Sequence, residues 1–244
     1  MTTLIPRRAL VTGGSGGIGR AICQQLARAG HYVYVHAFRQ LDVANQLVEE
    51  IRDGGGRAQV IAFDILDADA VSCAIESVLG EGTIQILINN AGVHDDAVFP
   101  GMRPEQWHRV IDTSLDGFFH VTQPLMLPMI RERWGRIVNL TSVAALSGNR
   151  GQVNYAAAKG ALNGATRALA LEVATRGITV NSVAPGIIST PMSDALFDEE
   201  TIARLVPMRR AGLPTEVASL VCYLVSEEAA FITGQVISIN GGMI

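Results

Sequence analysis

Short apolar runs alternate with longer segments of helical periodicity along the chain. The runs are continuous in their apolar character, which is typical of strands buried on both faces of a sheet. Strands joined by helices run parallel with right-handed crossovers. The pattern therefore predicts a single-domain α/β fold, a doubly wound seven-stranded parallel sheet flanked by helices, with strands at residues 8–12, 32–36, 58–63, 84–88, 136–141, 178–183 and 235–239.

Two segments depart from this regular pattern. A long helical segment begins at residue 104, but Pro124 and Pro128 lie within it, and we expect a kink or break there. Residues 189–213 have a weak pattern with several polar positions, which we interpret as a lid over a substrate. No repeat or linker divides residues 1–244, so the lid would belong to one domain.

Composition narrows the class of protein. With 48% hydrophobic and 17% charged residues the chain can bury a large core, and its formal net charge of −4 argues against nucleic-acid binding. No apolar stretch has the length of a signal peptide or membrane span, so we expect a cytoplasmic protein. Cys23, Cys73 and Cys222 are odd in number and lie in apolar helical patterns, which favours buried reduced thiols over disulfides or a metal site.

A glycine-rich loop follows the first strand directly and precedes a helical segment. Glycines allow a sharp turn and close approach of backbone N–H groups to a pyrophosphate, while the helix amino terminus favours negative charge. This arrangement predicts a Rossmann-type dinucleotide site. The candidate cofactor residues in the loop are Gly13, Gly14, Ser15, Gly17, Ile18 and Gly19.

The ends of the next strands supply further candidates for the cofactor site. No acid stands at the tip of the second strand, whereas Arg39 would pair with a 2′-phosphate, so we expect NADPH rather than NADH; an exposed surface arginine is the alternative. Asp64, followed by Ile65, would bind adenine or simply turn the chain. The cofactor groove also has candidates in Asn90, Ala91 and Gly92, although asparagines there would equally tie neighbouring strands together.

Ser142, Tyr155 and Lys159 form the candidate catalytic group. Ser142 follows the fifth strand, and Tyr155 and Lys159 are four apart in a segment of good helix formers, so they share one helical face. An adjacent ammonium favours the phenolate, and we expect Lys159 to lower the pKa of Tyr155 into the range useful for general acid–base catalysis. An ordinary buried tyrosine beside a surface lysine would have the same spacing.

These motifs together resemble the short-chain dehydrogenase/reductases along the whole chain, and most closely those that reduce 3-oxoacyl groups on acyl-carrier protein. The resemblance implies that Ser142 orients the carbonyl, Tyr155 donates the proton and Lys159 holds the nicotinamide ribose. It also implies cofactor contacts at Pro185, Gly186, Ile188 and Thr190.

Two positions depart from the family pattern. Ser114 stands where the family commonly has an asparagine that helps hold a proton-relaying water, and a hydroxyl offers fewer donors than an amide. We count Ser114 as a catalytic candidate and expect activity to survive the change. Gly16 stands where many NADPH-dependent relatives have a basic residue, so the expectation of NADPH depends on Arg39.

The resemblance also implies partners. Arg133 and Arg176 match docking arginines for an acidic carrier protein, although surface arginines often serve solubility alone. A homotetramer is expected, since relatives associate through the helix that carries a ridge of small residues, here Ala156, Gly160, Gly164 and Ala168; packing on the chain's own sheet would also explain the ridge.

The leading hypothesis is NADPH-dependent reduction of a 3-oxoacyl thioester, in fatty-acid or polyketide-like biosynthesis. A reductase or dehydrogenase of a free small alcohol, sugar or acyl-CoA is the alternative among enzymes. A cofactor-binding regulator or scaffold is the alternative from another class, and the presence of Ser142, Tyr155 and Lys159 argues against it.

Overall fold

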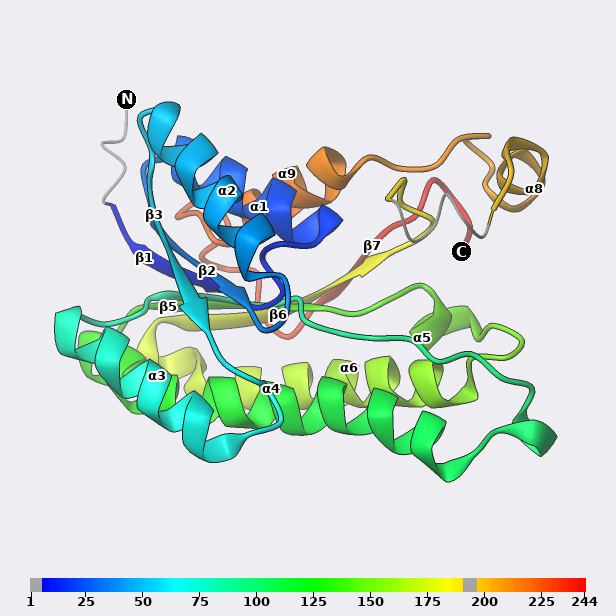
Figure 1. Cartoon of the computed structure of the whole chain (residues 1–244), viewed down its shortest axis with the longest axis horizontal. Coiled ribbons are helices and arrows are strands. Elements are labelled where there is room, and N and C mark those ends of the chain that lie inside the picture. The colour runs from blue at the N-terminus through cyan, green and yellow to red at the C-terminus, as the bar shows by residue number, and fades with distance from the viewer. Residues whose placement is uncertain (1–5, 191–196) are drawn as a thin grey trace.

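A seven-stranded parallel sheet forms the centre of the computed structural model, which describes residues 6–190 and 197–244 (Figure 1). The strand order is β3-β2-β1-β4-β5-β6-β7. The order changes direction between β1 and β4, and open α/β sheets bind ligands at such a switch point. The strands are β1 Arg8–Val11, β2 Tyr32–Ala37, β3 Arg57–Ala62, β4 Ile86–Asn89, β5 Gly135–Leu140, β6 Ile178–Pro185 and β7 Val236–Ile239.

Helices cover both faces of the sheet, which confirms the doubly wound fold (Figure 1). One face carries α1 Gly17–Arg28, α2 Leu41–Asp53 and α9 Pro214–Leu224. The other carries α3 Ala68–Glu81, α4 Pro104–Glu132 and α6 Val153–Val173. Shorter helices lie in the connections: η1 Phe99–Gly101, α5 Ala144–Ser147, η2 Ala174–Arg176 and α8 Glu199–Leu205.

The strands β1 to β6 each contribute to two separate apolar layers. In β1, Ala9 and Val11 pack with one layer, while Leu10 packs with the other. Successive side chains point to opposite faces of a strand, so a strand between two helical layers must be apolar at every position. The continuous apolar runs of the sequence have this cause.

The prolines do not break the long helix. α4 is continuous from Pro104 to Glu132 and contains both Pro124 and Pro128. Of the predicted kink or break, the break is therefore wrong. A proline inside a helix removes one backbone hydrogen bond and costs ~3 kcal/mol. Val121, Leu125 and Met129 are fully buried on the same helix, and their burial offsets that cost.

Two other expectations need correction or restriction. Cys23 is buried and Cys222 is half-buried, but Cys73 is exposed on α3, where the weakly amphipathic helix turns it outward.

Of the predicted lid, residues 191–196 lie outside the described part of the chain. The base of the lid is held by Ser189, whose N–H donates to the Gly212 carbonyl at 2.8 Å. Among residues 6–190 and 197–244, no helix is both long and apolar enough to cross a bilayer.

Candidate active site

The glycine loop between β1 and α1 is closed to side chains at several of its glycines. Gly13 has a φ of +60°, in the left-handed region that favours glycine. A Cβ on Gly19 would collide with the Gly13 carbonyl, and a Cβ on Gly17 would lie 2.9 Å from Thr190 Cγ2. The bare backbone at the start of α1 fits the pyrophosphate of a dinucleotide. Thr190, expected at the nicotinamide, therefore lies directly across the loop.

Asn90 joins the end of β4 to this loop. Its Nδ2 donates to the Thr12 carbonyl at 2.9 Å and to the Gly13 carbonyl at 3.0 Å. In return Thr12 Oγ1 accepts from the N–H groups of Asn90 and Ala91. The interpretation that this asparagine ties neighbouring strands is confirmed, and its side chain also holds the first residue of the loop. Gly92 lies against the catalytic group, because its Cβ would be 3.1 Å from Lys159 Nζ.

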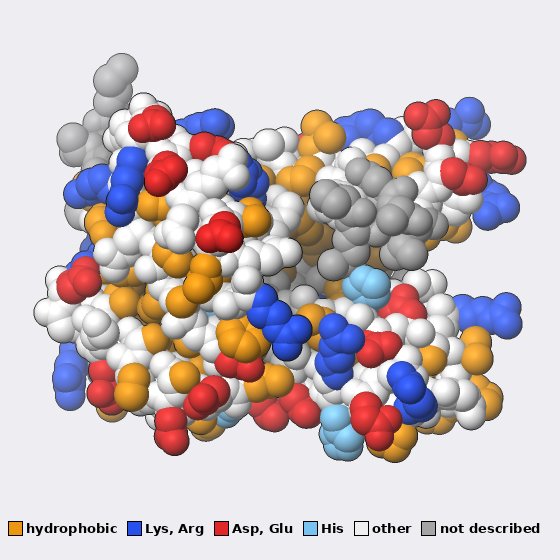
Figure 2. Space-filling view, viewed as in Figure 1, with side chains coloured by type: hydrophobic (Ala, Val, Ile, Leu, Met, Phe, Trp, Pro, Cys, Tyr) orange, Lys and Arg blue, Asp and Glu red, His pale blue; other side chains and the backbone are white. Residues whose placement is uncertain are grey.

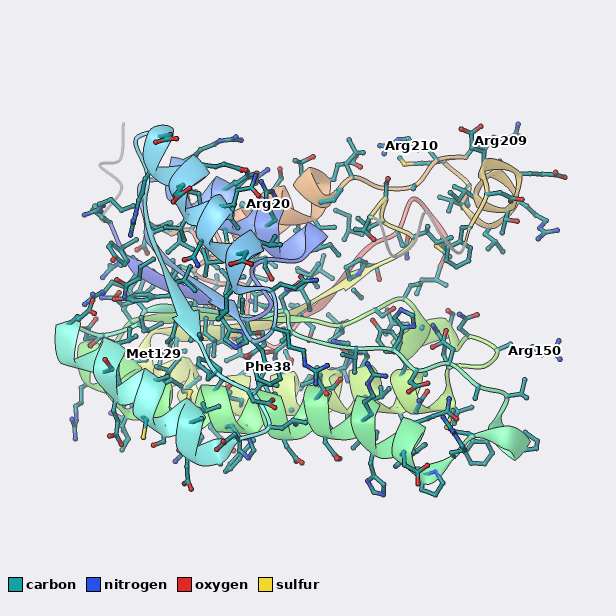
Figure 3. All side chains as sticks on the ribbon, in the orientation of Figure 1. Arg20, Phe38, Met129, Arg150, Arg209 and Arg210 are labelled. Atoms are coloured by element: carbon teal, nitrogen blue, oxygen red, sulfur yellow. The ribbon has the colours of Figure 1, made fainter. Side chains whose placement is uncertain are left out.

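The ends of β2 and β3 present the charged candidates. Arg39 is exposed, with Cζ 5.3 Å from the ring of Phe38, which lies beyond the end of β2 (Figure 3). Asp64 Oδ1 accepts the Leu66 N–H at 3.0 Å, so the carboxylate does turn the chain. Ile65 is buried against α4, where Gly117 allows its close approach. A contact of Asp64 with adenine stays a prediction.

Ser142, Tyr155 and Lys159 meet where β5 ends and α6 begins. The hydroxyls of Ser142 and Tyr155 are hydrogen-bonded to each other. Lys159 Nζ donates to the Leu140 carbonyl at 2.8 Å and lies 5.8 Å from the centre of the Tyr155 ring. On the face shown in Figure 2 the molecule is hollowed between the part that carries α8 and the part that carries α5 and η1, and β6 points toward this hollow (Figure 1).

Burial controls the acid–base properties of the group. Burial raises the pKa of Tyr155, the hydrogen bond from Ser142 lowers it in part, and the charge of Asp96 raises it further. The net shift of the Tyr155 pKa is therefore upward, opposite to the predicted lowering, and Lys159 is not among its causes. Burial also lowers the pKa of Lys159 to about 8, since water no longer stabilises its charge. Tyr155 is thus a protonated hydroxyl at neutral pH.

Asp95 and Asp96, which the sequence analysis did not select as candidates, lie beside the catalytic group of Ser142, Tyr155 and Lys159. Asn154 Nδ2 donates to the Asp95 carbonyl at 2.9 Å, and Gln152 Nε2 donates to Asp96 at 2.8 Å. Because Gln152 and Asn154 immediately precede Tyr155, these bonds hold the segment beside the tyrosine and bring Asp96 near it. Its only sequence signal was its position directly after Gly92.

Ser114 lies deep in the interface between α4 and the rest of the fold. Its side chain is 3% exposed, and its Oγ makes no hydrogen bond within the described residues. Two contacts bracket it on α4: Gln106 accepts from Asn154 of α6, and Thr122 accepts from Asn89 of β4. Ser114 is therefore a buried hydroxyl on the stretch of α4 between these two contacts, and its part in a relay stays a prediction.

The segment after β6 lies beside the cofactor loop, as the resemblance implied. Pro185 ends β6, and the Gly186 N–H donates to the Ile239 carbonyl at 2.9 Å. Ile188 is buried and pairs with Gly212. These contacts bring Thr190 to the start of α1. Cofactor-binding candidates from the beginning of the chain and from the segment after β6 therefore lie side by side.

Arg133 and Arg176 lie together but away from the catalytic group. Arg133 Nη2 donates to the carbonyl of Thr175 at 3.0 Å, and both arginines are exposed. They follow α4 and α6 and precede β5 and β6, so they lie at the amino end of the sheet. Arg150, Arg209 and Arg210 lie at the opposite end, near the hollow (Figure 3).

Comparison with known proteins agrees with this geometry. The family model described as enoyl-(acyl carrier protein) reductase matches residues 13–244. A 3-oxoacyl-[acyl-carrier-protein] reductase of Aggregatibacter actinomycetemcomitans is 44% identical over 236 residues, covering 96% of this chain and 98% of the relative. The enzyme with the same name from Staphylococcus aureus is 44% identical over 240 residues, covering 97% and 98%. An acetoacetyl-CoA reductase of an Acinetobacter species is 42% identical over 239 residues, covering 96% of each.

Proposed function

The chain belongs to the short-chain dehydrogenase/reductase family and is an oxidoreductase acting between C=O and CH–OH, and from this premise we propose that it reduces 3-oxoacyl thioesters with NADPH. The observation that carries the proposal is the hydrogen-bonded pair of hydroxyls, Ser142 and Tyr155, next to a buried lysine and a bare glycine loop. Two hydroxyl donors suit a ketone oxygen, which gains a proton during reduction.

The residues divide the work of the reaction. Ser142 and Tyr155 hold the ketone oxygen, and Tyr155 donates its proton because its raised pKa keeps it protonated. Lys159 is charged below about pH 8 and stabilises the tyrosinate that remains after the transfer. The bound cofactor supplies the hydride. The glycine loop would hold the pyrophosphate of the cofactor and the segment through Thr190 its nicotinamide end, so position and electrostatics are the protein's main contribution.

The proposal favours a carbonyl over a carbon–carbon double bond. Reduction of an enoyl thioester places the final proton on carbon, for which two hydroxyls converging on one oxygen are not arranged. The names of the similar relatives point the same way: they act on 3-oxoacyl or acetoacetyl groups. Crotonyl thioesters therefore serve as a matched negative substrate for acetoacetyl thioesters.

NADPH is proposed over NADH because of Arg39. Its side chain is exposed at the end of β2, where the 2′ position of the adenosine ribose would lie. Its partner within the described residues is the ring of Phe38, which holds the guanidinium without neutralising its charge. Asp64 follows the neighbouring strand β3, and its Oδ1 accepts the N–H of Leu66.

We also propose an acyl-carrier protein as the substrate's carrier, docking at Arg133 and Arg176. Their position at the amino end of the sheet means that a carrier bound there serves the site of a neighbouring chain. Charge reversal of Arg133 to Glu should weaken turnover of the carrier-bound substrate about tenfold and leave a pantetheine thioester unaffected. Arg28→Glu, an exposed arginine at the end of α1, is the control.

We propose that the chain is a cytoplasmic homotetramer. Gly164 and Ala168 of the small-residue ridge are exposed, and a Cβ on Gly164 would meet nothing within 4 Å, so this half of the ridge is open to a partner. Leu171 on the same helix is 84% exposed, and Phe119 and Leu127 are exposed on α4. Light scattering should give a mass of four chains, and Leu171→Glu should reduce it.

The experiment that tests the function follows NADPH oxidation with acetoacetyl thioesters, on carrier protein and on pantetheine, with NADH and crotonyl thioesters in parallel. Rapid turnover of the acetoacetyl substrates with NADPH supports the proposal. Turnover of crotonyl thioesters alone would replace it with enoyl reduction, and preference for acetoacetyl-CoA would replace the carrier. NADPH binding with no turnover of any carbonyl substrate would favour the regulator.

A further inference from the structure

A buried histidine lies directly beneath the glycine loop. His36, near the end of β2, is 3% exposed, and its Nδ1 accepts the backbone N–H of Gly13 at 3.0 Å. Its Nε2 lies 3.1 Å from the carbonyl of Phe63, just past β3. The imidazole also packs on the Phe63 ring, with centres 4.1 Å apart. One side chain thus connects three segments that border the cofactor site.

The contacts determine which ring nitrogen carries the proton. Because the Gly13 N–H is a donor, Nδ1 must accept, so the proton is on Nε2 and is donated to the Phe63 carbonyl. Burial lowers the pKa of His36 to about 4, while the neighbouring Asp64 carboxylate raises it and only partly offsets the burial. The ring is therefore neutral at physiological pH, which both hydrogen bonds require.

Gly13 is the first residue of the loop and has the left-handed φ of +60°. The peptide before it also bears the carbonyl of Thr12, which Asn90 holds from the other side. Gly14 is held by β2 as well, since its N–H donates to the backbone carbonyl of His36 at 2.8 Å. Hydrogen bonds from both β4 and β2 thus hold the loop. Within the described residues, His36 is the only residue of β2 whose side chain makes one of these hydrogen bonds.

We propose that His36 is a positioning residue for the cofactor: its Nδ1 holds the Gly13 N–H so that the rest of the glycine loop faces the pyrophosphate. Without this acceptor the Gly13 N–H would be a buried donor with no partner, and the loop would relax to find one. The consequence falls on cofactor affinity and not on the chemical step, because His36 touches none of Ser142, Tyr155 or Lys159. The inference rests on the dinucleotide binding of the family and not on the proposed acyl substrate.

His31 offers a control in the same strand region. At the start of β2, its Nδ1 accepts the N–H of Arg7 at 3.2 Å, and it is also buried. The bond has the same chemistry as that of His36, but it lies at the amino end of the sheet. A change at His31 therefore tests the stability cost of losing such a bond without touching the loop.

Two substitutions separate the hydrogen bond from the packing of the ring. His36→Phe keeps an aromatic ring against Phe63 and removes both hydrogen bonds. His36→Asn loses the ring but places an amide oxygen where Nδ1 lies, so it can still accept from Gly13. The measurements are the Kd of NADPH and of NADH by fluorescence titration, with KM and kcat on an acetoacetyl thioester where turnover is present.

We expect His36→Phe to raise the Kd and the cofactor KM about tenfold while kcat changes less than about twofold. His36→Asn should stay within about threefold of the wild type, and His31→Phe should lower the melting temperature without changing the Kd. Wild-type affinity in His36→Phe, or an equal loss in His31→Phe, would overturn the proposal. Should His36→Phe fail to fold, His36→Ala replaces it, and equal affinities of the Ala and Asn variants would then refute the role of the acceptor.

Discussion

The two ends of the sheet treat their buried polar groups differently. At the amino end, Arg136 is 2% exposed, but it donates to the carbonyls of Gly135 and Gly177 and pairs with Glu227. Its guanidinium and that of Arg7 lie 4.3 and 4.2 Å from the centre of the Trp134 ring. At the carboxyl end, Lys159 Nζ donates to the carbonyl of Leu140 and, among the described residues, has no carboxylate partner.

The difference shows how burial can serve stability or chemistry. Burial lowers the pKa of Arg136 as well, but the charge of Glu227 partly offsets this effect, and an arginine stays charged at neutral pH. A buried charge with few partners has a shifted pKa and can accept new partners, which is what a catalytic group needs. We therefore expect changes at the amino end to alter unfolding and changes at the carboxyl end to alter catalysis.

The largest effect is expected at the proton donor. Tyr155→Phe removes the hydroxyl and should reduce kcat by about 10³-fold or more, while the Kd of NADPH stays near the wild-type value. Tyr32→Phe is the control at the amino end, where the hydroxyl donates to Gln59 at 2.9 Å, and it should leave kcat unchanged. A Tyr155→Phe enzyme with wild-type turnover would remove Tyr155 from the assigned role.

Lys159→Met should separate catalysis from stability most clearly. Turnover should fall about 10²-fold, since the tyrosinate loses its cation. The pKa of Lys159 is lowered from 10.5 to about 8 in the folded protein, so between these pH values the unfolded chain binds a proton that the folded one does not. Wild-type stability therefore gains from this group as pH rises through that window.

At pH 7 the Met variant should consequently be more stable than the wild type, by on the order of 3 kcal/mol at most, and the advantage should shrink toward pH 10. Denaturant unfolding at pH 7 and pH 10 measures it. A Met variant less stable than the wild type at pH 7 would contradict the view that the buried ammonium is a cost carried for function.

Arg136→Met tests the amino end. It removes a buried guanidinium with several partners and should lower the free energy of unfolding by roughly 1–3 kcal/mol. The kcat/KM for an acetoacetyl thioester should not change. Thermal unfolding and steady-state kinetics on the same samples check both parts. A loss of kcat without a loss of stability would contradict the view that Arg136 serves stability alone.

Arg39→Ala probes the outer edge of the carboxyl end. The Kd of NADPH should rise about tenfold, because one charge-assisted contact with a phosphate is lost, and the Kd of NADH should stay the same. Fluorescence titration with both cofactors measures the ratio. Arg57→Ala, an exposed arginine at the start of β3, is the control. Equal changes for the two cofactors would exclude a 2′-phosphate contact.

The smallest effect is expected at Ser114. Its buried hydroxyl has no hydrogen-bond partner in the described part of the chain, so Ser114→Ala should be neutral or stabilising by up to about 1 kcal/mol. We expect kcat to stay within about threefold of the wild type. A loss of tenfold or more would show that the serine takes part in proton transfer.

Local pattern was sufficient for much of this protein. Continuous apolar strands, helical periodicity and the glycine loop predicted the sheet, its parallel direction and the tight turn between β1 and α1, because these features depend on neighbours in the sequence. The spacing of Tyr155 and Lys159 predicted a shared helical face for the same reason. Of the kink or break that local pattern predicted at Pro124 and Pro128, the break is wrong, because burial of the rest of α4 outweighs the local cost.

Only the tertiary structure decided what each polar residue experiences. His31 and His36 lie five positions apart and make the same kind of bond, yet β1 and its loop place one at the amino end and the other under Gly13. Lys159 was expected to lower the pKa of Tyr155, but burial is the largest cause of the shift at both residues, raising the pKa of Tyr155 and lowering that of Lys159. Desolvation depends on atoms from every surrounding element, so the sequence determined which groups are present and the fold determined their chemistry.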